Sequence, residues 1–95
     1  MINERIGFLK LDIEGAEYEV LKDIEDKLFL IDNIFIEYHG SFEQNSELIN
    51  ILLILRSSQF KFYIKEATPV YNTPFHRKIS APPYDVQLNI FAFKN

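Results

Sequence analysis

The sequence contains no cysteine, and only three of its 95 residues are glycine. The lack of cysteine excludes disulfide bonds, thiolate metal sites and a cysteine nucleophile. The glycines stand alone at positions 7, 15 and 40, so the chain has no glycine-rich loop that could cradle a phosphate or a nucleotide. No serine lies in the pattern of a nucleophile elbow. These absences remove several classes of enzyme before any motif is considered.

The chain also lacks an excess of basic residues and a long apolar run. Its 10 Lys and Arg residues are scattered among 14 Asp and Glu residues, whereas nucleic-acid binders gather positive charge on one face. The longest apolar stretch, residues 48–55, is broken by Asn50 and falls far short of the roughly 20 residues that a membrane span needs. No apolar signal core follows the first residues. We therefore expect a soluble cytoplasmic protein that binds neither nucleic acid nor membranes.

The apolar residues that are present predict an α/β sheet of four strands. Residues 6–12 form a nearly continuous apolar run, which is typical of a strand covered on both faces. Residues 16–27 repeat apolar side chains at helical spacing, with Glu17 and other charged residues on the opposite side. We expect further strands at 33–38, 60–65 and 86–93, and a second helix at 43–56. The separation of the first two strands favours a helical crossover between parallel strands.

A segment with four prolines, Pro69, Pro74, Pro82 and Pro83, separates the last two predicted strands. Loops of this length in a small domain are usually functional or mobile. His76 and Arg77 in this loop could contact a substrate, but a solvated loop over packed aromatic residues is the simpler interpretation.

Charged residues mark the ends of the first two predicted strands. Lys10 and Asp12 share one face of the first strand, and Glu37 and His39 share one face of the second. If the strands end level, Lys10 lies opposite Glu37 and Asp12 opposite His39, about 5 Å apart. Open α/β sheets bind ligands at this carboxyl edge, where an Asp–His pair could act as a general base. The structural alternatives are a Lys10–Glu37 ion pair and a strand-end role for Asp12 and His39.

A metal site is not favoured by the spacing of these residues. Asp12, Glu14 and His39 offer oxygen and nitrogen ligands, but without a regular ligand pattern. A metal-dependent hydrolase that uses these three residues is therefore a minor alternative, and we expect no metal.

The motifs at the two strand ends closely resemble the FkbM family of methyltransferases. The family's hallmark is a strand ending in Lys-x-Asp-x-Glu-Gly-x-Glu, then a helix, then a strand ending in Glu-x-His. Residues 8–22 read FLKLDIEGAEYEVLK and residues 34–39 read IFIEYH, so 8–39 match at nearly every hallmark position. Residues 40–95 agree with the family in the order of elements only.

The resemblance implies a partial Rossmann-like methyltransferase fold: a four-stranded mixed sheet with three parallel strands, a last antiparallel strand and two main helices. The last strand would insert between the second and third. Residues 1–95 would then be a single partial domain, the C-terminal half of a methyltransferase domain. The resemblance also implies methyl transfer from S-adenosylmethionine to an oxygen of a sugar or a related small molecule.

In this resemblance Asp12 and Glu14 match the motif beside the methyl-transfer site, and Glu37 and His39 match the second motif at the neighbouring strand end. We predict catalytic roles for Asp12, Glu14 and His39, with the choice of base left open, and contact to the acceptor or structural support for Lys10 and Glu37. The strands that usually hold the cofactor are missing, so we expect no activity from this chain alone. The alternative is a non-catalytic assembly module. Its exposed apolar first strand would pair with a second copy, or with a chain that supplies the missing N-terminal half.

Overall fold

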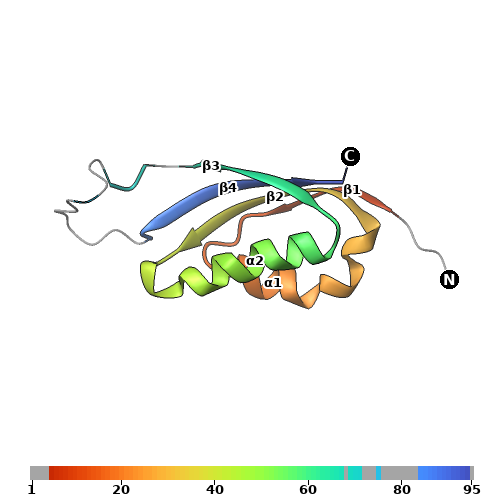
Figure 1. Ribbon diagram of the computed structural model, residues 1–95, viewed down its shortest axis with the longest axis horizontal. Coiled ribbons are helices and arrows are strands. Elements are labelled where there is room, and N and C mark those ends of the chain that lie inside the picture. The colour runs from red at the N-terminus through yellow and green to blue at the C-terminus, as the bar shows by residue number, and fades with distance from the viewer. Residues whose placement is uncertain (1–4, 68, 72–74, 76–83, 95) are drawn as a thin grey trace.

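Four strands form one sheet in the order β1-β2-β4-β3, and two α-helices lie on one of its faces (Figure 1). The computed structural model describes residues 5–67, 69–71, 75 and 84–94, so His76 and Arg77 lie outside the described residues. The strands are β1 Ile6–Leu11, β2 Ile31–Gly40, β3 Lys61–Glu66 and β4 Val86–Phe93. The helices are α1 Glu17–Asp23 and α2 Asn45–Ser57, and the short 3-10 helices are η1 Glu25–Leu30 and η2 Phe42–Gln44. Within these described ranges, no helix is long and apolar enough to cross a membrane.

The predicted elements are all present, but the first helix is divided. It is α-helical only to Asp23, and the tighter helix η1 then leads into β2. Ile24 joins the two parts, since its N–H donates to the carbonyl of Val20 while its own carbonyl accepts from Lys27. The tighter turn carries Leu28 into the core, where it is fully buried. Helical periodicity does not distinguish these two kinds of helix over so short a segment.

The strand pairing corrects the expected sheet. Among the described residues, β1 and β2 form the only parallel pair. β4 lies between β2 and β3 and pairs with both in the antiparallel sense. The insertion of the last strand between the second and third is thus confirmed. The expected three parallel strands reduce to one parallel pair, because β3 runs in the same direction as β2 but is bonded to the antiparallel β4. β3 has no parallel partner because β4 separates it from β2.

The register between β1 and β2 also differs from the expected one. Lys10 lies opposite Phe35, two residues earlier than Glu37, and the pairing ends with Leu11 opposite Ile36. A shift of two residues keeps every side chain on its face of the sheet, so the apolar pattern fits both registers equally well. No ion pair joins Lys10 to Glu37 in the described part of the chain; the Lys10 ammonium lies 5.9 Å from the centre of the Phe35 ring.

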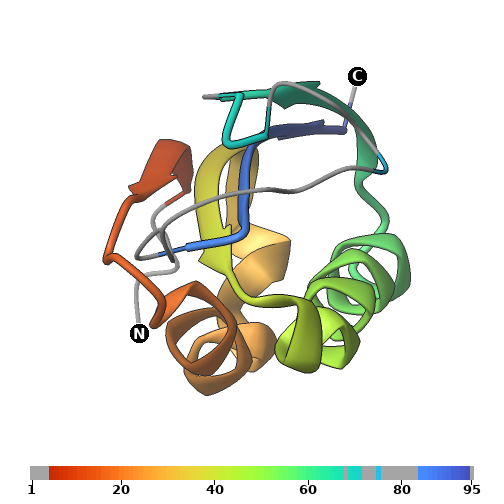
Figure 2. The ribbon, with the colours of Figure 1, turned by 90° about the vertical axis from the view of Figure 1, so that its left-hand side faces the viewer.

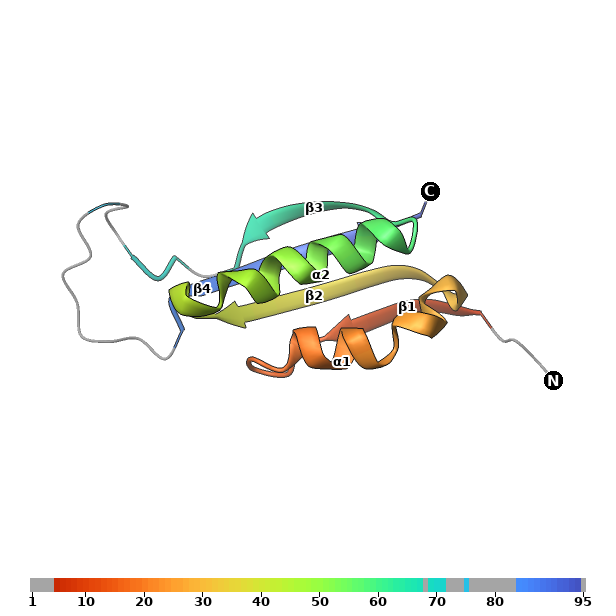
Figure 3. The same cartoon turned by 60° about the horizontal axis from the view of Figure 1, so that its bottom comes forward.

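The core lies between the helices and one face of the sheet. Figures 2 and 3 show α1 and α2 side by side on this face. Side chains from every strand but β3 are buried here with residues of both helices; they include Leu11, Leu21, Ile34, Ile36, Tyr38, Ile51, Leu55, Ile90 and Ala92. Alternating residues of β2 and β4 supply the sheet side of this core, as the period of a strand requires.

The opposite face of the sheet carries a row of aromatic rings. Phe91 of β4 packs against Phe35 of β2 and Tyr63 of β3, with ring centres 5.2 and 5.0 Å apart. The expectation that the first strand is covered on both faces is wrong for the described residues, because Ile6 and Phe8 of β1 are 46% and 59% exposed. β1 is an edge strand.

The packing at the end of β2 requires a residue without a side chain at position 40. A substitution of Gly40 therefore tests this packing. A Cβ atom on Gly40 would lie 2.5 Å from Cζ of Tyr38, closer than real contacts allow. Tyr38 is buried and donates a hydrogen bond to the carbonyl of Gln44, so it has little room to move. We predict that Gly40→Ala lowers the free energy of unfolding in urea by about 1–3 kcal/mol, the usual cost of overpacking.

Gly7→Ala is the matched control, because a Cβ on Gly7 meets nothing within 4 Å. We expect this variant to stay within about 0.5 kcal/mol of the parent chain, as surface substitutions usually do. Equal effects of the two substitutions would contradict the contact between Gly40 and Tyr38.

Candidate functional site

The turn that leaves β1 has an unusual backbone. It contains Glu14 and Gly15, both with positive φ angles, of 45° and 102°. Glycine adopts such an angle without steric cost, whereas a residue with a side chain does so less readily. Two such residues in succession bend the chain sharply, and the first residue of α1 can thereby reach back to the turn.

Glu17, that first residue of α1, joins the ends of β1 and β2 through its buried carboxylate. Oε2 accepts hydrogen bonds from the backbone N–H groups of Ile13, at 2.9 Å, and of Gly15, at 3.2 Å. Oε1 accepts from the backbone N–H of His39 in β2, at 3.1 Å. The side chain is fully shielded from solvent, and a carboxylate in that position requires donors of this kind.

The expectation that Glu17 lies on the solvent side of the first helix is therefore wrong. Helical periodicity assigns a residue to a side of the helix, but a residue in the first turn can fold its side chain back over the preceding loop. One signal for Glu17 was present in the sequence, because it is the last residue of the motif Lys-x-Asp-x-Glu-Gly-x-Glu.

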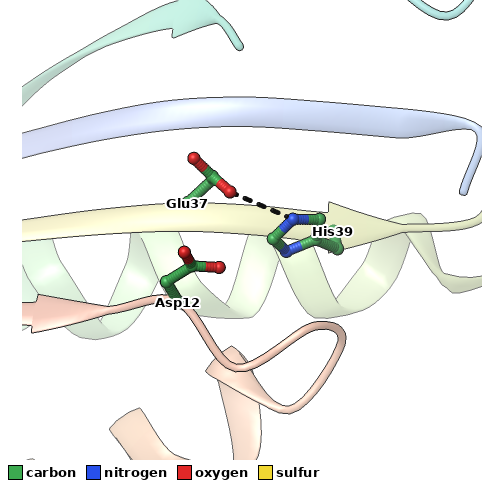
Figure 4. A group of neighbouring side chains, drawn as sticks. All are labelled: Asp12, Glu37 and His39. Atoms are coloured by element: carbon green, nitrogen blue, oxygen red, sulfur yellow. Dashed lines mark ion pairs between the residues drawn. The ribbon is translucent and has the colours of Figure 1, made fainter. Parts of the chain in front are cut away.

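His39 lies near the end of β2 between two carboxylates. Its Nδ1 is 3.5 Å from Oε2 of Glu17, and its Nε2 is 3.2 Å from Oε2 of Glu37 (Figure 4). The ring of Tyr84 packs against the imidazole with ring centres 5.1 Å apart. His39 is only 8% exposed. The imidazole is thus held on both nitrogens and on one face.

Asp12 completes a cluster with Glu37 and His39. Their potential ligand atoms all lie within 4.8 Å of one another (Figure 4). Asp12 immediately follows β1 and is exposed, and it has no hydrogen bond or ion pair in the described part of the chain. The offset register brings Asp12 level with Glu37 rather than with His39, and the three groups still meet. The cluster lies at the carboxyl edge of the parallel pair, where α/β sheets bind ligands.

The other two candidate residues lie outside this cluster. Glu14 is exposed and does not belong to the group; its backbone carbonyl accepts a hydrogen bond from the Tyr84 hydroxyl at 2.8 Å. Lys10 lies beside Phe35. The roles of Lys10 and Glu14 remain predictions.

Two further polar residues near the cluster are not singled out by the sequence. Asn89 of β4 lies directly opposite Glu37, and its Oδ1 is buried with no hydrogen-bond partner within the described ranges. Tyr38 precedes His39 on the other face of β2. Burial raises the pKa of the Tyr38 phenol, and the negative charges of Glu47 and Glu17 raise it further. The phenol therefore remains neutral in the core.

The fold and the edge cluster define an α/β domain with a polar site at the ends of its parallel strands. A comparison with protein families matches residues 1–62 to the methyltransferase FkbM domain. The chain therefore belongs to the FkbM family of methyltransferases. No curated protein and no solved structure matches the chain.

The role of Glu17 in holding the strand ends is testable by one isosteric change. In Glu17→Gln the two carboxylate oxygens become one carbonyl and one amide, so at least one of the three backbone donors loses its acceptor. Bonds to charged groups contribute about 1.5–3 kcal/mol, and we expect the free energy of unfolding in urea to fall by roughly that amount.

Glu19→Gln serves as the control because Glu19 is exposed on the same helix. It removes the same charge without removing an acceptor from the turn. Equal stability of the two variants would contradict the bridging role of Glu17.

Proposed function

We propose that this chain supplies the acceptor side of methyl transfer from S-adenosylmethionine to an oxygen of a sugar or a related small molecule. Membership of a methyltransferase family supports the type of reaction. The observation that carries the proposal is the cluster of Asp12, Glu37 and His39 at the carboxyl edge of β1 and β2. Carboxylates and an imidazole are groups that can bind a hydroxyl and accept its proton.

The residues of the cluster differ in what they can do. The Asp12 carboxylate is exposed and free of partners in the described ranges, so an acceptor hydroxyl can reach it. Glu17 orients the His39 ring from behind, and Glu37 lies on its other side. We propose that Asp12 and His39 receive the proton and that Glu37 helps to orient the hydroxyl. Glu14 is retained as a candidate through the family motif alone.

The residues that the structure describes do not fit a cradle for S-adenosylmethionine. Close approach of a nucleotide requires glycines whose Cβ side is open. A Cβ added to Gly15 would lie 3.7 Å from the ring of Tyr84, and one added to Gly40 would collide with Tyr38. Gly7 has open space beside it, but it lies near the start of β1, away from the carboxyl end of the strand. We therefore place the main cofactor site in a segment outside this chain and propose that the chain alone is inactive.

Titrations of S-adenosylhomocysteine and of sugars into the purified chain test these proposals. Binding is detected by ¹H–¹⁵N NMR and calorimetry. S-adenosylhomocysteine should not bind, and no methyl transfer from labelled S-adenosylmethionine should occur. A panel of D-glucose, D-galactose and D-mannose should shift the signals around Asp12 and His39 with at least one sugar. Asp12→Asn should abolish that shift, whereas the exposed Asp23→Asn should preserve it.

Tight binding of S-adenosylhomocysteine would show that the chain forms a cofactor site, and turnover would show that it is active. Either result would contradict the proposal. Absence of any sugar-dependent shift would contradict the acceptor role.

A specific observation also favours the alternative of an assembly module. β1 is an edge strand, and its side chains Ile6 and Phe8 are exposed. Unpaired edges of this kind recruit other strands. The oligomeric mass, measured by light scattering on the same samples, decides this point: a monomer at high concentration contradicts pairing of two copies through β1, and a dimer supports it.

A further inference from the structure

We propose that Asp12, Glu37 and His39 form a binding site for a divalent transition-metal cation. The three side chains come from two neighbouring segments, the turn after β1 and the last part of β2. One ligand atom from each lies within 4.8 Å of the other two, close enough for a cation to contact all three after small rotations of the side chains. Figure 4 shows the Asp12 carboxylate reaching from the turn after β1 toward Glu37 and His39 of β2.

The position of Glu17 favours a histidine ready to bind metal. Glu17 lies 3.5 Å from Nδ1 of His39 and can hold the proton on that nitrogen. In this tautomer Nε2 carries the lone pair. Nε2 is the nitrogen that faces Glu37, at 3.2 Å. Histidines that bind metals commonly have a carboxylate behind the other ring nitrogen, which fixes both the tautomer and the ring.

A second observation, independent of the cluster, concerns Asn89, the residue paired with Glu37 on the neighbouring strand. Asn89 lies opposite Glu37 in the register of β2 and β4, so the two side chains share a face of the sheet. The Oδ1 atom of Asn89 is buried and has no hydrogen-bond partner in the described part of the chain. A buried acceptor of this kind normally has a partner, such as a protein donor, a water molecule or an ion. A cation with its coordinated water beside Glu37 would satisfy it.

The three ligand side chains indicate which class of cation would bind. One imidazole and two carboxylates suit Mn²⁺, Fe²⁺, Co²⁺ or Zn²⁺, whereas Mg²⁺ and Ca²⁺ prefer sites made only of oxygen. The two carboxylate charges would be neutralised by one divalent ion. Asp12 is exposed, so the cation would keep open positions toward solvent.

These open positions connect the cation to the acceptor. A hydroxyl bound to a divalent cation is more acidic than a free one, because the positive charge stabilises the alkoxide. Glu37 and His39 would then act as ligands, and Asp12, bound through one oxygen, would receive the proton of the hydroxyl on its other oxygen. This catalytic role rests on the proposed function, whereas binding of the cation does not.

Titration of MnCl₂ into the purified, metal-free chain tests the site directly. Binding is measured by calorimetry and by the electron paramagnetic resonance signal of free Mn²⁺, with ZnCl₂ and MgCl₂ titrated in parallel. We expect one saturable site for Mn²⁺ and Zn²⁺, and weaker binding of Mg²⁺. Loss of even an outer partner of a metal ligand weakens binding about 10–100-fold, so Asp12→Asn and Glu37→Gln should each weaken it at least about tenfold.

Asp23→Asn is the matched control because Asp23 is exposed at the end of α1, away from the cluster. It should bind the cations as the parent chain does. Asp12 makes no described hydrogen bond, so its variant should keep the fold, which circular dichroism verifies. Absence of saturable binding of both Mn²⁺ and Zn²⁺, or equal binding by Asp12→Asn, Glu37→Gln and the parent, would overturn the site. The titration contains no cofactor and no sugar, so this failure is distinct from a failure of the acceptor role.

Discussion

The buried carboxylate of Glu17 is the constraint on which the carboxyl edge of the sheet depends. The parallel pairing ends with Leu11 opposite Ile36, so β2 continues beyond its partner. In that continuation the N–H of His39 donates to Glu17 instead of to a strand. The same carboxylate accepts from Ile13 and Gly15 in the turn. The Glu17 side chain thus bonds to β2 where β1 has already ended, and it fixes the turn that carries Asp12.

This arrangement brings several polar groups together at one edge of the sheet. The backbone of His39 is held by one oxygen of Glu17, and its ring lies beside the other. Glu37 lies beside the remaining ring nitrogen, and Asp12 completes the cluster. A methyl acceptor and a divalent cation would both bind to oxygen and nitrogen groups that the backbone holds in position. The fixed turn also explains why the motif requires a glycine at position 15, where φ is 102°.

Much of the fold and part of the candidate site could be predicted from the sequence. Apolar periodicity located every strand, and the bounds of β4 agree with the prediction because residues 86–93 are bordered by polar residues and proline. The rule that α/β sheets bind ligands at the carboxyl ends of their strands placed Asp12 and His39 at one edge. It grouped them with Glu14, whereas the structure places Glu37 beside them and leaves Glu14 outside the cluster. The rest depends on interactions that periodicity does not encode. A register shift of two residues leaves the apolar pattern unchanged, and the burial of Glu17 depends on a turn whose geometry is set by Glu14 and Gly15.

The central claim is that Glu17 holds the turn to β2, and amide hydrogen exchange of the unaltered chain tests it most directly. Amides in an exposed turn normally exchange freely, whereas those of core strands exchange only through larger opening. The account predicts that the amides of Ile13, Gly15 and His39 are protected to a similar extent as that of Ile36 in the core of β2. Free exchange of the first three, with Ile36 still protected, would contradict it.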